Sequence, residues 1–447
     1  MNFQILTKYL LVFFILILSA SIYSQNNFRI ENGKGKFTAK FDLVNDLVII
    51  PISVNGQPLS FLLDTGVDST ILFDHAEGDT IDLNSQSVIY LKGLGDGKPL
   101  RAILSRGNEV QFGDAISDKH NIYVIQGGVF NLSNRMGVAI NGILGYDFFK
   151  NFIVEFNYRR EKVSVFDPQY YEYGKCGKCI DLPLSFYKKK PYIDAEVVLD
   201  DNQKKKVKLL LDSGSGDAIW LFQNQEKGIE LPEASFSDFL GFGISGSVYG
   251  DRTRIKELHI GKFQLMDVTA SFPDSTSLAY MDNFEARNGT LGAQVIKRFH
   301  SVIDYRGRNI RLKPNGDFRE PFEYDMSGVV VKHSGFKIVK NKDLNSQRYS
   351  DEEGPERGVM VYKTSVQVFY SMEPNYEIAE IRPDSPAEFA GLKIGDELLK
   401  LNGKVVHKYS LENINRVLSS GEGKRIRMEV LREGKPVKLS FVLKRIL

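Results

Sequence analysis

An internal repeat constrains this chain more than any other feature of its sequence. Residues 61–66 (FLLDTG) return as residues 209–214 (LLLDSG), 148 positions later, and residues 141–145 (NGILG) return as residues 288–292 (NGTLG), 147 positions later. One Asp-Ser/Thr-Gly triplet is an easy coincidence in a chain of 447 residues, but two triplets, each followed after 80–81 residues by the same second motif, are not. The sequence therefore contains a duplicated lobe.

Each copy is predicted to be mostly β-structure. Residues 47–54 (LVIIPISV) form an apolar strand, and Asn55-Gly56 is a strong signal for a two-residue hairpin. The second copy repeats this order from residue 192 onward. Short helices are expected after Gly145 and Gly292, followed by strands over 152–156 and 299–305.

The repeated triplet places an aspartate where a buried strand turns. Its glycine allows close approach of the backbone, and its hydroxyl supplies a short local hydrogen bond. One such turn per lobe can bring Asp64 and Asp212 face to face across an approximate two-fold axis. Two carboxyl groups that face each other in close contact share a proton. One of them can then act as a base on water while the other acts as an acid.

These motifs resemble the catalytic loops of bilobal aspartic proteases of the pepsin and retropepsin type, over roughly residues 37–318. The resemblance implies that Asp64 and Asp212 are the catalytic pair of an aspartic-type endopeptidase and that the substrate is a polypeptide. It implies no metal and no organic cofactor. The expected fold is mainly β, with two duplicated retropepsin-like acid-protease β-barrel lobes.

The resemblance also implies a supporting role for the residues that follow each aspartate. Thr65 and Ser213 are expected to exchange hydrogen bonds across the junction of the lobes, and Gly66 and Gly214 complete the dyad-supporting set. The second loop is one residue longer than the family pattern. A loop of this length leaves open a displacement of Asp212 relative to Asp64 or a third carboxylate, Asp217, near the pair, and the position of Asp68 raises the same question.

A glycine-rich turn follows each aspartate at the same distance of 29 residues. The resemblance to aspartic proteases implies that each of these turns is a flap, one from each lobe, and that the flaps close over an extended peptide. The predicted flap and substrate-binding residues are Gly93, Leu94 and Gly95 in the first copy and Gly241, Phe242 and Gly243 in the second.

From residue 375 onward the sequence resembles an α/β PDZ domain. The matching segments are residues 385–387 (SPA), 390–392 (AGL), 395–396 (GD) and 402–403 (NG). The resemblance implies a groove helix over 410–419 and capture of a C-terminal peptide ligand beside a sheet edge. A packing or dimerising role is the alternative. We expect a first strand over 329–332 that ends at residues 334–336, followed by a structureless polar insertion at about 337–372.

Residues 1–25 are predicted to be a signal peptide. A basic lead at Lys8 precedes an apolar run over 9–18, which is short for a membrane span, and small residues follow. The chain is therefore expected to be exported to the periplasm or the cell exterior. The alternative is an uncleaved segment that anchors it in a membrane.

Two cysteines, Cys176 and Cys179, lie between the lobes. In an exported protein a local disulfide is favoured over a metal site, which needs two more ligands, and over a redox site, which needs a βαβ context. Basic residues (58) nearly balance acidic ones (56), so the chain has almost no net charge. Its composition therefore provides no positive electrostatic field that would attract nucleic acid.

Together these features predict an exported aspartic endopeptidase that carries a PDZ domain. The rival interpretation is a non-catalytic peptide-binding or scaffold protein that keeps the protease fold. In a third interpretation, the aspartates are structural residues in the turns of a duplicated sandwich. The predicted domains are a signal peptide (1–25), the first lobe (26–168), a linker with the two cysteines (169–180), the second lobe (181–320) and the PDZ domain (321–447).

Overall fold

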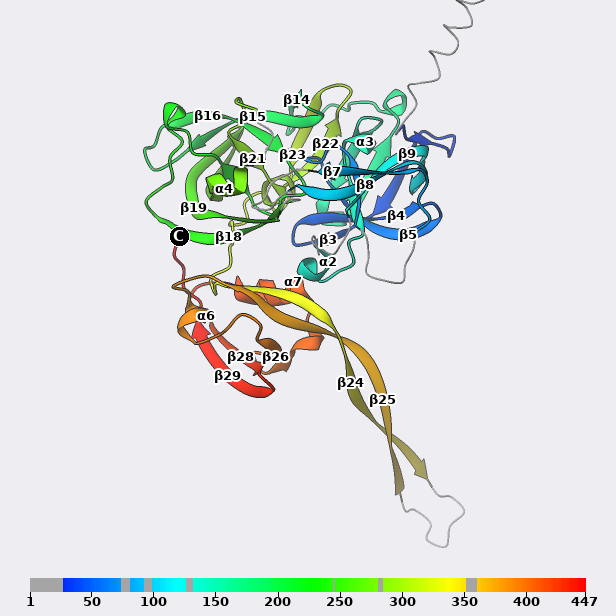
Figure 1. The fold of residues 1–447 in the computed structure, drawn as a ribbon, viewed down its shortest axis with the longest axis vertical. Helices are drawn as coiled ribbons and strands as arrows, with labels where there is room; N and C mark the ends of the chain where they lie inside the picture. Colours follow the sequence, from blue (N-terminus) through cyan, green and yellow to red (C-terminus); the bar gives the residue numbers. More distant parts are fainter. Residues whose placement is uncertain are drawn as a thin grey trace, which may run out of the picture. The chain divides into compact units, whose positions relative to one another are not determined.

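A computed structural model describes residues 27–73, 81–91, 99–125, 132–243, 246–279, 284–350 and 360–447 (Figure 1). The predicted signal peptide lies outside these residues. The chain divides into two compact units, of which the second comprises residues 134–137 and 325–444. Each unit is mostly β-structure. Within the described ranges, none of the helices combines the length and the apolar composition needed to cross a bilayer.

The first lobe is a nine-stranded sheet that closes on itself. Its strands follow the order β1-β9-β6-β10-β5-β4-β8-β7, with β3 paired to β4, and β8 also pairs with β9. The predicted turn at Asn55-Gly56 joins β4 and β5, and both residues have positive φ, at 48° and 82°. The elements are β1 (Arg29–Ile30), β3 (Asp42–Val44), β4 (Leu47–Val54), β5 (Gln57–Leu63), β6 (Thr70–Phe73), β7 (Gln86–Leu91), β8 (Leu100–Phe112), β9 (Ala115–Ile125), α2 (Leu132–Met136), β10 (Gly142–Leu144) and α3 (Tyr146–Phe149).

The second lobe repeats this arrangement with eight strands. Their order is β14-β15-β16-β21-β17-β20-β19-β18, and the additional pairing of β15 with β19 closes the sheet. In both lobes a short strand, β10 or β21, runs parallel to the strand that leads into the aspartate. The elements are β14 (Ser185–Tyr187), β15 (Lys190–Val198), β16 (Lys204–Leu211), β17 (Ile219–Leu221), η3 (Gln225–Lys227), β18 (Ser235–Gly243), β19 (Gly246–Ile260), β20 (Phe263–Pro273), α4 (Ser275–Leu278), β21 (Gly289–Leu291) and α5 (Ala293–Ile296).

A six-stranded sheet joins the two lobes. Its order is β13-β23-β22-β11-β12-β2, so the antiparallel pair β11 and β22 brings one strand from each copy together at the centre. Apolar side chains of both lobes form one continuous core behind this sheet, in which Phe149 stacks on Tyr305. The elements are β2 (Lys36–Lys40), β11 (Ile153–Asn157), η1 (Tyr158–Arg160), β12 (Lys162–Phe166), η2 (Pro168–Tyr170), β13 (Ile180–Pro183), β22 (Phe299–Asp304) and β23 (Asn309–Pro314).

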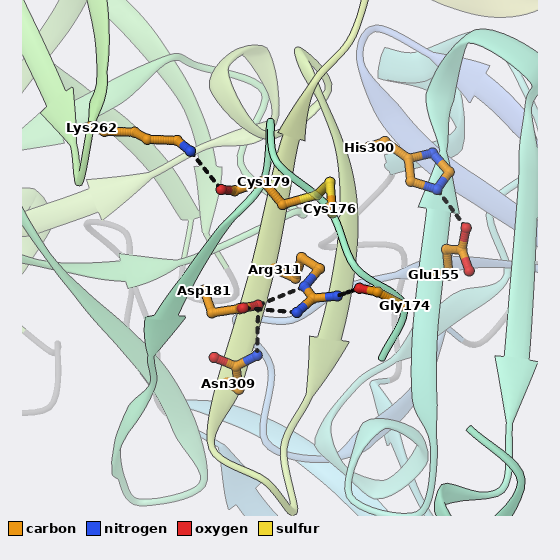
Figure 2. Close-up of a disulfide and its surroundings, with 9 residues drawn as sticks. All are labelled: Glu155, Gly174, Cys176, Cys179, Asp181, Lys262, His300, Asn309 and Arg311. Carbon is orange, nitrogen blue, oxygen red and sulfur yellow. Dashed lines mark hydrogen bonds and ion pairs between the residues drawn. A yellow bond between two sulfur atoms is a disulfide. The ribbon is translucent and has the colours of Figure 1, made fainter. Parts of the chain in front are cut away.

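The linker between the lobes contains the disulfide that the sequence favoured, between Cys176 and Cys179 (Figure 2). Lys262 donates a hydrogen bond to the carbonyl of Cys179, at 2.7 Å. Arg311 binds the carboxylate of Asp181 through two nitrogens, at 2.7 and 2.8 Å, and also the carbonyl of Gly174. The linker is therefore held by polar contacts on both sides of the disulfide.

The second unit has a sheet in the order β24-β25-β26-β28-β29, with β27 paired to β26. Its main helix, α7, buries Leu411, Ile414 and Leu418 on one face, and Ser410 caps its N-terminus. The elements are β24 (Val329–Ser350), β25 (Met360–Ile381), α6 (Pro386–Phe389), β26 (Glu397–Leu401), β27 (Lys404–Val405), η4 (Val406–Lys408), α7 (Leu411–Leu418), β28 (Arg425–Arg432) and β29 (Lys435–Val442).

The predicted structureless insertion is instead a long two-stranded arm. β24 and β25 stay paired from Val329↔Ile381 out to Ser350↔Met360, and Figure 1 shows the two strands projecting beyond the rest of their sheet. The first strand does not end at residues 334–336, because a register shift at this point accommodates them and Gly335 adopts a φ of +100°. The expected end of the first strand at residues 334–336 was therefore wrong, because β24 continues to Ser350.

Candidate active site

Equivalent strand ends position the two aspartates. β5 ends at Leu63, and the backbone N–H of Asp64 donates to the carbonyl of Leu144 on the parallel strand β10, at 3.0 Å. β16 ends at Leu211, and the N–H of Asp212 donates in the same way to Leu291 on β21, also at 3.0 Å. The second repeated motif therefore lies directly behind each aspartate.

Thr65 and Ser213 cross-link the two loops reciprocally. The N–H of Thr65 donates to Oγ of Ser213, and the N–H of Ser213 donates to Oγ1 of Thr65, both at 3.0 Å. The hydroxyl of Thr65 donates to the carbonyl of Leu211 at 2.8 Å, and that of Ser213 to the carbonyl of Leu63 at 3.1 Å. Both side chains are buried, so these four bonds fix the positions of the two loops relative to each other.

Gly66 and Gly214 face the opposite carboxyl groups. A Cβ atom on Gly66 would lie 2.6 Å from Cγ of Asp212, and one on Gly214 would overlap Oδ2 of Asp64. Each glycine N–H donates to the aspartate of its own loop, at 2.7 Å for Gly66 and 3.1 Å for Gly214. The absence of a side chain at both glycines lets the two carboxyl groups approach one another.

The carboxyl groups of Asp64 and Asp212 lie close together, each against the glycine of the opposite loop, and Asp64 is only 5% exposed. Burial raises the pKa of Asp64 well above its ordinary value, and the negative charge of Asp212 raises it further. Burial also raises the pKa of Asp212, against an opposing effect of the positive charge of Arg287. A pair of this kind holds a shared proton over a range of pH in which a solvated aspartate has lost its own.

Three residues that the sequence did not single out interact with this pair or with its loops. Lys190, at the start of β15, lowers the pKa of both aspartates through its positive charge. Tyr305 donates its hydroxyl to the carbonyl of Thr65 at 3.1 Å, and burial followed by the charges of the pair raises the pKa of that phenol. The third is Arg287, named above. Only the repeated position of Tyr305, matched by Tyr158 in the first copy, gave a signal in the sequence.

Asp217 is engaged elsewhere as the partner of an arginine. Arg252 donates to Asp217 and to Asp238, both at 2.9 Å, and these side chains are nearly buried. Trp220 and Ser271 donate to the other carboxylate oxygen of Asp217, at 2.6 and 2.9 Å. The hydrogen-bonding capacity of Asp217 is thus used in holding the second loop to β18 and β19.

The two predicted flaps differ in how much of them the structure describes. Gly93, Leu94 and Gly95 lie outside the described residues, and the strands on either side, β7 and β8, pair up to Leu91↔Leu100. Gly241, Phe242 and Gly243 end β18 and pair with Val248, Ser247 and Gly246 of β19. The second glycine-rich turn therefore belongs to a β-hairpin. Among the described residues, no cluster of three or more His, Cys, Asp or Glu side chains suits a metal ion.

Comparison with known families finds an aspartyl protease domain followed by a PDZ domain. The family model described as aspartyl protease matches residues 50–148, and the model described as PDZ domain matches residues 377–432. The expected resemblance to an aspartyl protease with a PDZ domain and the expected mainly β fold are thereby confirmed.

One characterised relative also resembles part of this chain. It is the periplasmic serine endoprotease DegP of Salmonella typhimurium (strain LT2), 29% identical over 117 residues. The similarity covers 24% of this chain and 24% of the relative, so the chain matches about a quarter of the length of that protein.

Proposed function

We propose that this protein is an aspartic-type endopeptidase that hydrolyses peptide bonds through a water molecule activated by Asp64 and Asp212. Thr65, Gly66, Ser213 and Gly214 brace this dyad. The aspartyl protease and PDZ domains together support a protease with peptide recognition. The aspartic mechanism and the catalytic pair are our proposal.

The observation that carries the proposal is the close approach of the two loops, in which each carboxyl group lies against the glycine of the opposite triplet. The ionised carboxylate accepts a proton from water while the water oxygen attacks the peptide carbonyl, and the protonated carboxyl donates to the carbonyl oxygen. The tetrahedral intermediate then collapses: the nitrogen takes the proton that the carboxylate accepted from water, the C–N bond breaks, and the hydroxyl that accepted a proton from the second carboxyl returns it as the carbonyl re-forms. A base and an acid are both present in one pair only while it holds a single proton.

In this proposal the glycine-rich turns at residues 93–95 and 241–243 enclose an extended peptide substrate. The hairpin of β18 and β19 supports this role for the second turn, because Arg252 joins it to the loop of Asp212 through Asp217. The PDZ domain recognises a peptide segment by adding it to the edge of its sheet.

We also propose that the protein is exported. The apolar N-terminal run, the disulfide of the linker and the partial similarity to a periplasmic protein support this location. Contact with a membrane is proposed only for a form in which the N-terminal segment is not cleaved. We propose no nucleic-acid partner.

The proposal is tested by digesting a peptide library with the purified protein and its Asp64→Asn and Asp212→Asn variants. Each variant is expected to lose cleavage while remaining folded, because an amide supplies neither the base nor the shared proton. Asp194→Asn, at an exposed ion pair with Lys208, is the matched control and is expected to cleave normally. Full cleavage by either dyad variant contradicts the proposal. Peptide binding by the wild type without any cleavage favours the scaffold interpretation.

A further inference from the structure

The carboxylate of Asp325 accepts hydrogen bonds from a set of backbone N–H groups at the start of the second unit, which holds the PDZ domain. The N–H groups of Gly328 and Val329 donate to its Oδ2, at 2.5 and 3.1 Å. The N–H and the hydroxyl of Ser327 donate to its Oδ1, at 3.2 and 2.6 Å. Three consecutive backbone N–H groups thus converge on one carboxylate, in the arrangement called an anion nest.

A buried cation lies beside this nest. Arg382 is 6% exposed, and its Nη1 donates to the backbone carbonyl of Asp325 at 3.3 Å. Its backbone N–H also donates to the carbonyl of Gly328, at 2.8 Å. The positive charge and the converging donors both favour a carboxylate at this point.

The nest lies where a peptide added to the sheet would end. β24 begins at Val329, directly after the nest, and in the described part of the chain it is the terminal strand of its sheet. Helix α7 packs against β24, and the loop is tied to the end of that helix by the N–H of Met326, which donates to the carbonyl of Leu418 at 3.4 Å. A peptide pairing with the free edge of β24 would place its terminal carboxylate in a backbone nest of this kind.

We propose that Asp325 is a built-in competitor for the C-terminal carboxylate of a peptide that binds between β24 and α7. The inference rests on the proposed peptide recognition by the PDZ domain and specifies the feature that the ligand must carry, a free C-terminal carboxylate. The ligand binds only in the fraction of molecules from which the Asp325 side chain has left the nest.

This competition lowers the apparent affinity by the fraction of vacant nests. Asp325 lies two to four residues from its donors in the chain, so its effective concentration at the nest is high. If the nest is occupied in nine molecules of ten or more, removal of the carboxylate strengthens binding by about tenfold or more.

Asp325 is also the first residue of the second unit in this part of the chain. The segment before it is anchored in the first unit, because Arg254 donates to the carbonyl of Phe322 at 2.7 Å and the N–H of Ile446 donates to the hydroxyl of Tyr324 at the same distance.

The test measures peptide binding to the full-length chain carrying Asp64→Asn, which removes the proposed cleavage of the probe. The probes are fluorescein-labelled hexapeptides ending in Val, Leu or Phe, each with a free carboxylate and as its C-terminal amide. We expect Asp325→Ala to bind free-acid peptides at least tenfold more tightly than the parent, with no gain for the amides. Glu422→Gln, which removes an exposed carboxylate of the same unit, is the control and should leave both affinities unchanged.

Three results would overturn the inference. They are equal affinity of the parent and Asp325→Ala for the free acids, an equal gain for acids and amides, and no binding of free acids by either protein. Asp325→Asn, which keeps the shape and one acceptor oxygen, replaces Asp325→Ala if that variant is unfolded by circular dichroism, and a smaller gain restricted to free acids is then expected. Cleavage assays on the dyad variants are separate, so failure of the inference and failure of the proposed endopeptidase are distinguishable.

Discussion

Gly66 and Asp212 face each other across the junction of the two lobes, with room for a hydrogen atom on the glycine but not for a methyl group. A Cβ atom at Gly66 would lie 2.6 Å from Cγ of Asp212, far inside normal contact. Gly214 has the same relationship to Asp64. The glycine of each triplet therefore sets the distance between the carboxyl groups as well as the shape of its own turn.

Gly66→Ala and Gly214→Ala are each expected to lower kcat/KM for peptide cleavage by about a hundredfold. The methyl group must displace the opposite carboxyl group, and a shift of about 1 Å in a reacting group costs a factor of this size. Gly216→Ala is the matched control in the same loop, because its Cβ would meet its nearest neighbour, the carbonyl of Asn45, at an ordinary 3.7 Å. Normal activity of both variants would show that the pair tolerates separation.

Peptide cleavage is expected to be fastest at acidic pH and to decline as the pH rises. Burial raises the pKa of Asp64 and of Asp212, so the pair keeps its proton above the range of a solvated aspartate. When that proton is lost, no acid remains to protonate the carbonyl oxygen. The pH profile of kcat/KM measures this loss. A plateau that extends into alkaline solution contradicts the mechanism.

The same pKa shifts predict how the dyad affects stability. An aspartate whose pKa is raised in the folded state binds its proton more tightly there than in the unfolded chain. Its stabilising contribution is complete below the ordinary aspartate pKa and is lost as the pH rises through the folded-state value. Thermal unfolding should therefore show that the wild type loses stability relative to Asp64→Asn as the pH increases. A difference that grows in the opposite direction contradicts the assigned shifts.

Much of this site was predictable because the chain carries it twice. Repetition identified Asp64 and Asp212 as equivalent positions, and the short helices expected after Gly145 and Gly292 are present as α3 and α5. The roles of the predicted site residues stay proposals. Lys190 and Arg287 were missed because a cation acts through space, and its distance from the pair depends on how the turns fold.

The arm of the PDZ unit was missed for a different reason. A strand can be recognised in a sequence by the alternation of apolar and polar residues only where one of its faces is buried and the other is exposed. Residues 337–358 are largely polar and lack that alternation, so the segment resembled a loop, whereas the pairing of β24 with β25 depends on backbone hydrogen bonds. The ion pair between Asp217 and Arg252 also could not be predicted from the sequence, because the two residues are 35 positions apart and no motif spacing connects them.

Arg252 is expected to be essential for the stability of the second lobe. Arg252→Met leaves the nearly buried carboxylates of Asp217 and Asp238 without their shared cation, which costs about 3–5 kcal/mol in the free energy of unfolding. Arg252→Lys keeps the charge but not the fork that reaches both partners, so a smaller loss is expected. Urea unfolding measures both variants.

The control for this prediction is Lys204→Met in the same lobe. Lys204 is 54% exposed and meets Glu196 at 3.7 Å, and an exposed pair of this kind contributes about 1 kcal/mol or less. If Arg252→Met and Lys204→Met unfold at the same urea concentration, the Arg252 network does not stabilise the lobe.

Since the network also joins β18 and β19 to the loop of Asp212, Arg252→Lys is expected to raise KM for peptides.

The disulfide of the linker is expected to contribute modestly to stability. Cys176 and Cys179 are only three positions apart, and closure of so short a loop removes little entropy from the unfolded chain, equivalent to about 2 kcal/mol. The contacts made by Lys262 and Arg311 bind backbone carbonyls, so they persist when both cysteines are replaced by serine. Urea unfolding of this double variant should show a loss of about 2 kcal/mol or less, with peptide cleavage unchanged. A loss of cleavage would mean that the linker holds the two lobes in register, and that the bonds between Thr65 and Ser213 do not suffice to do so.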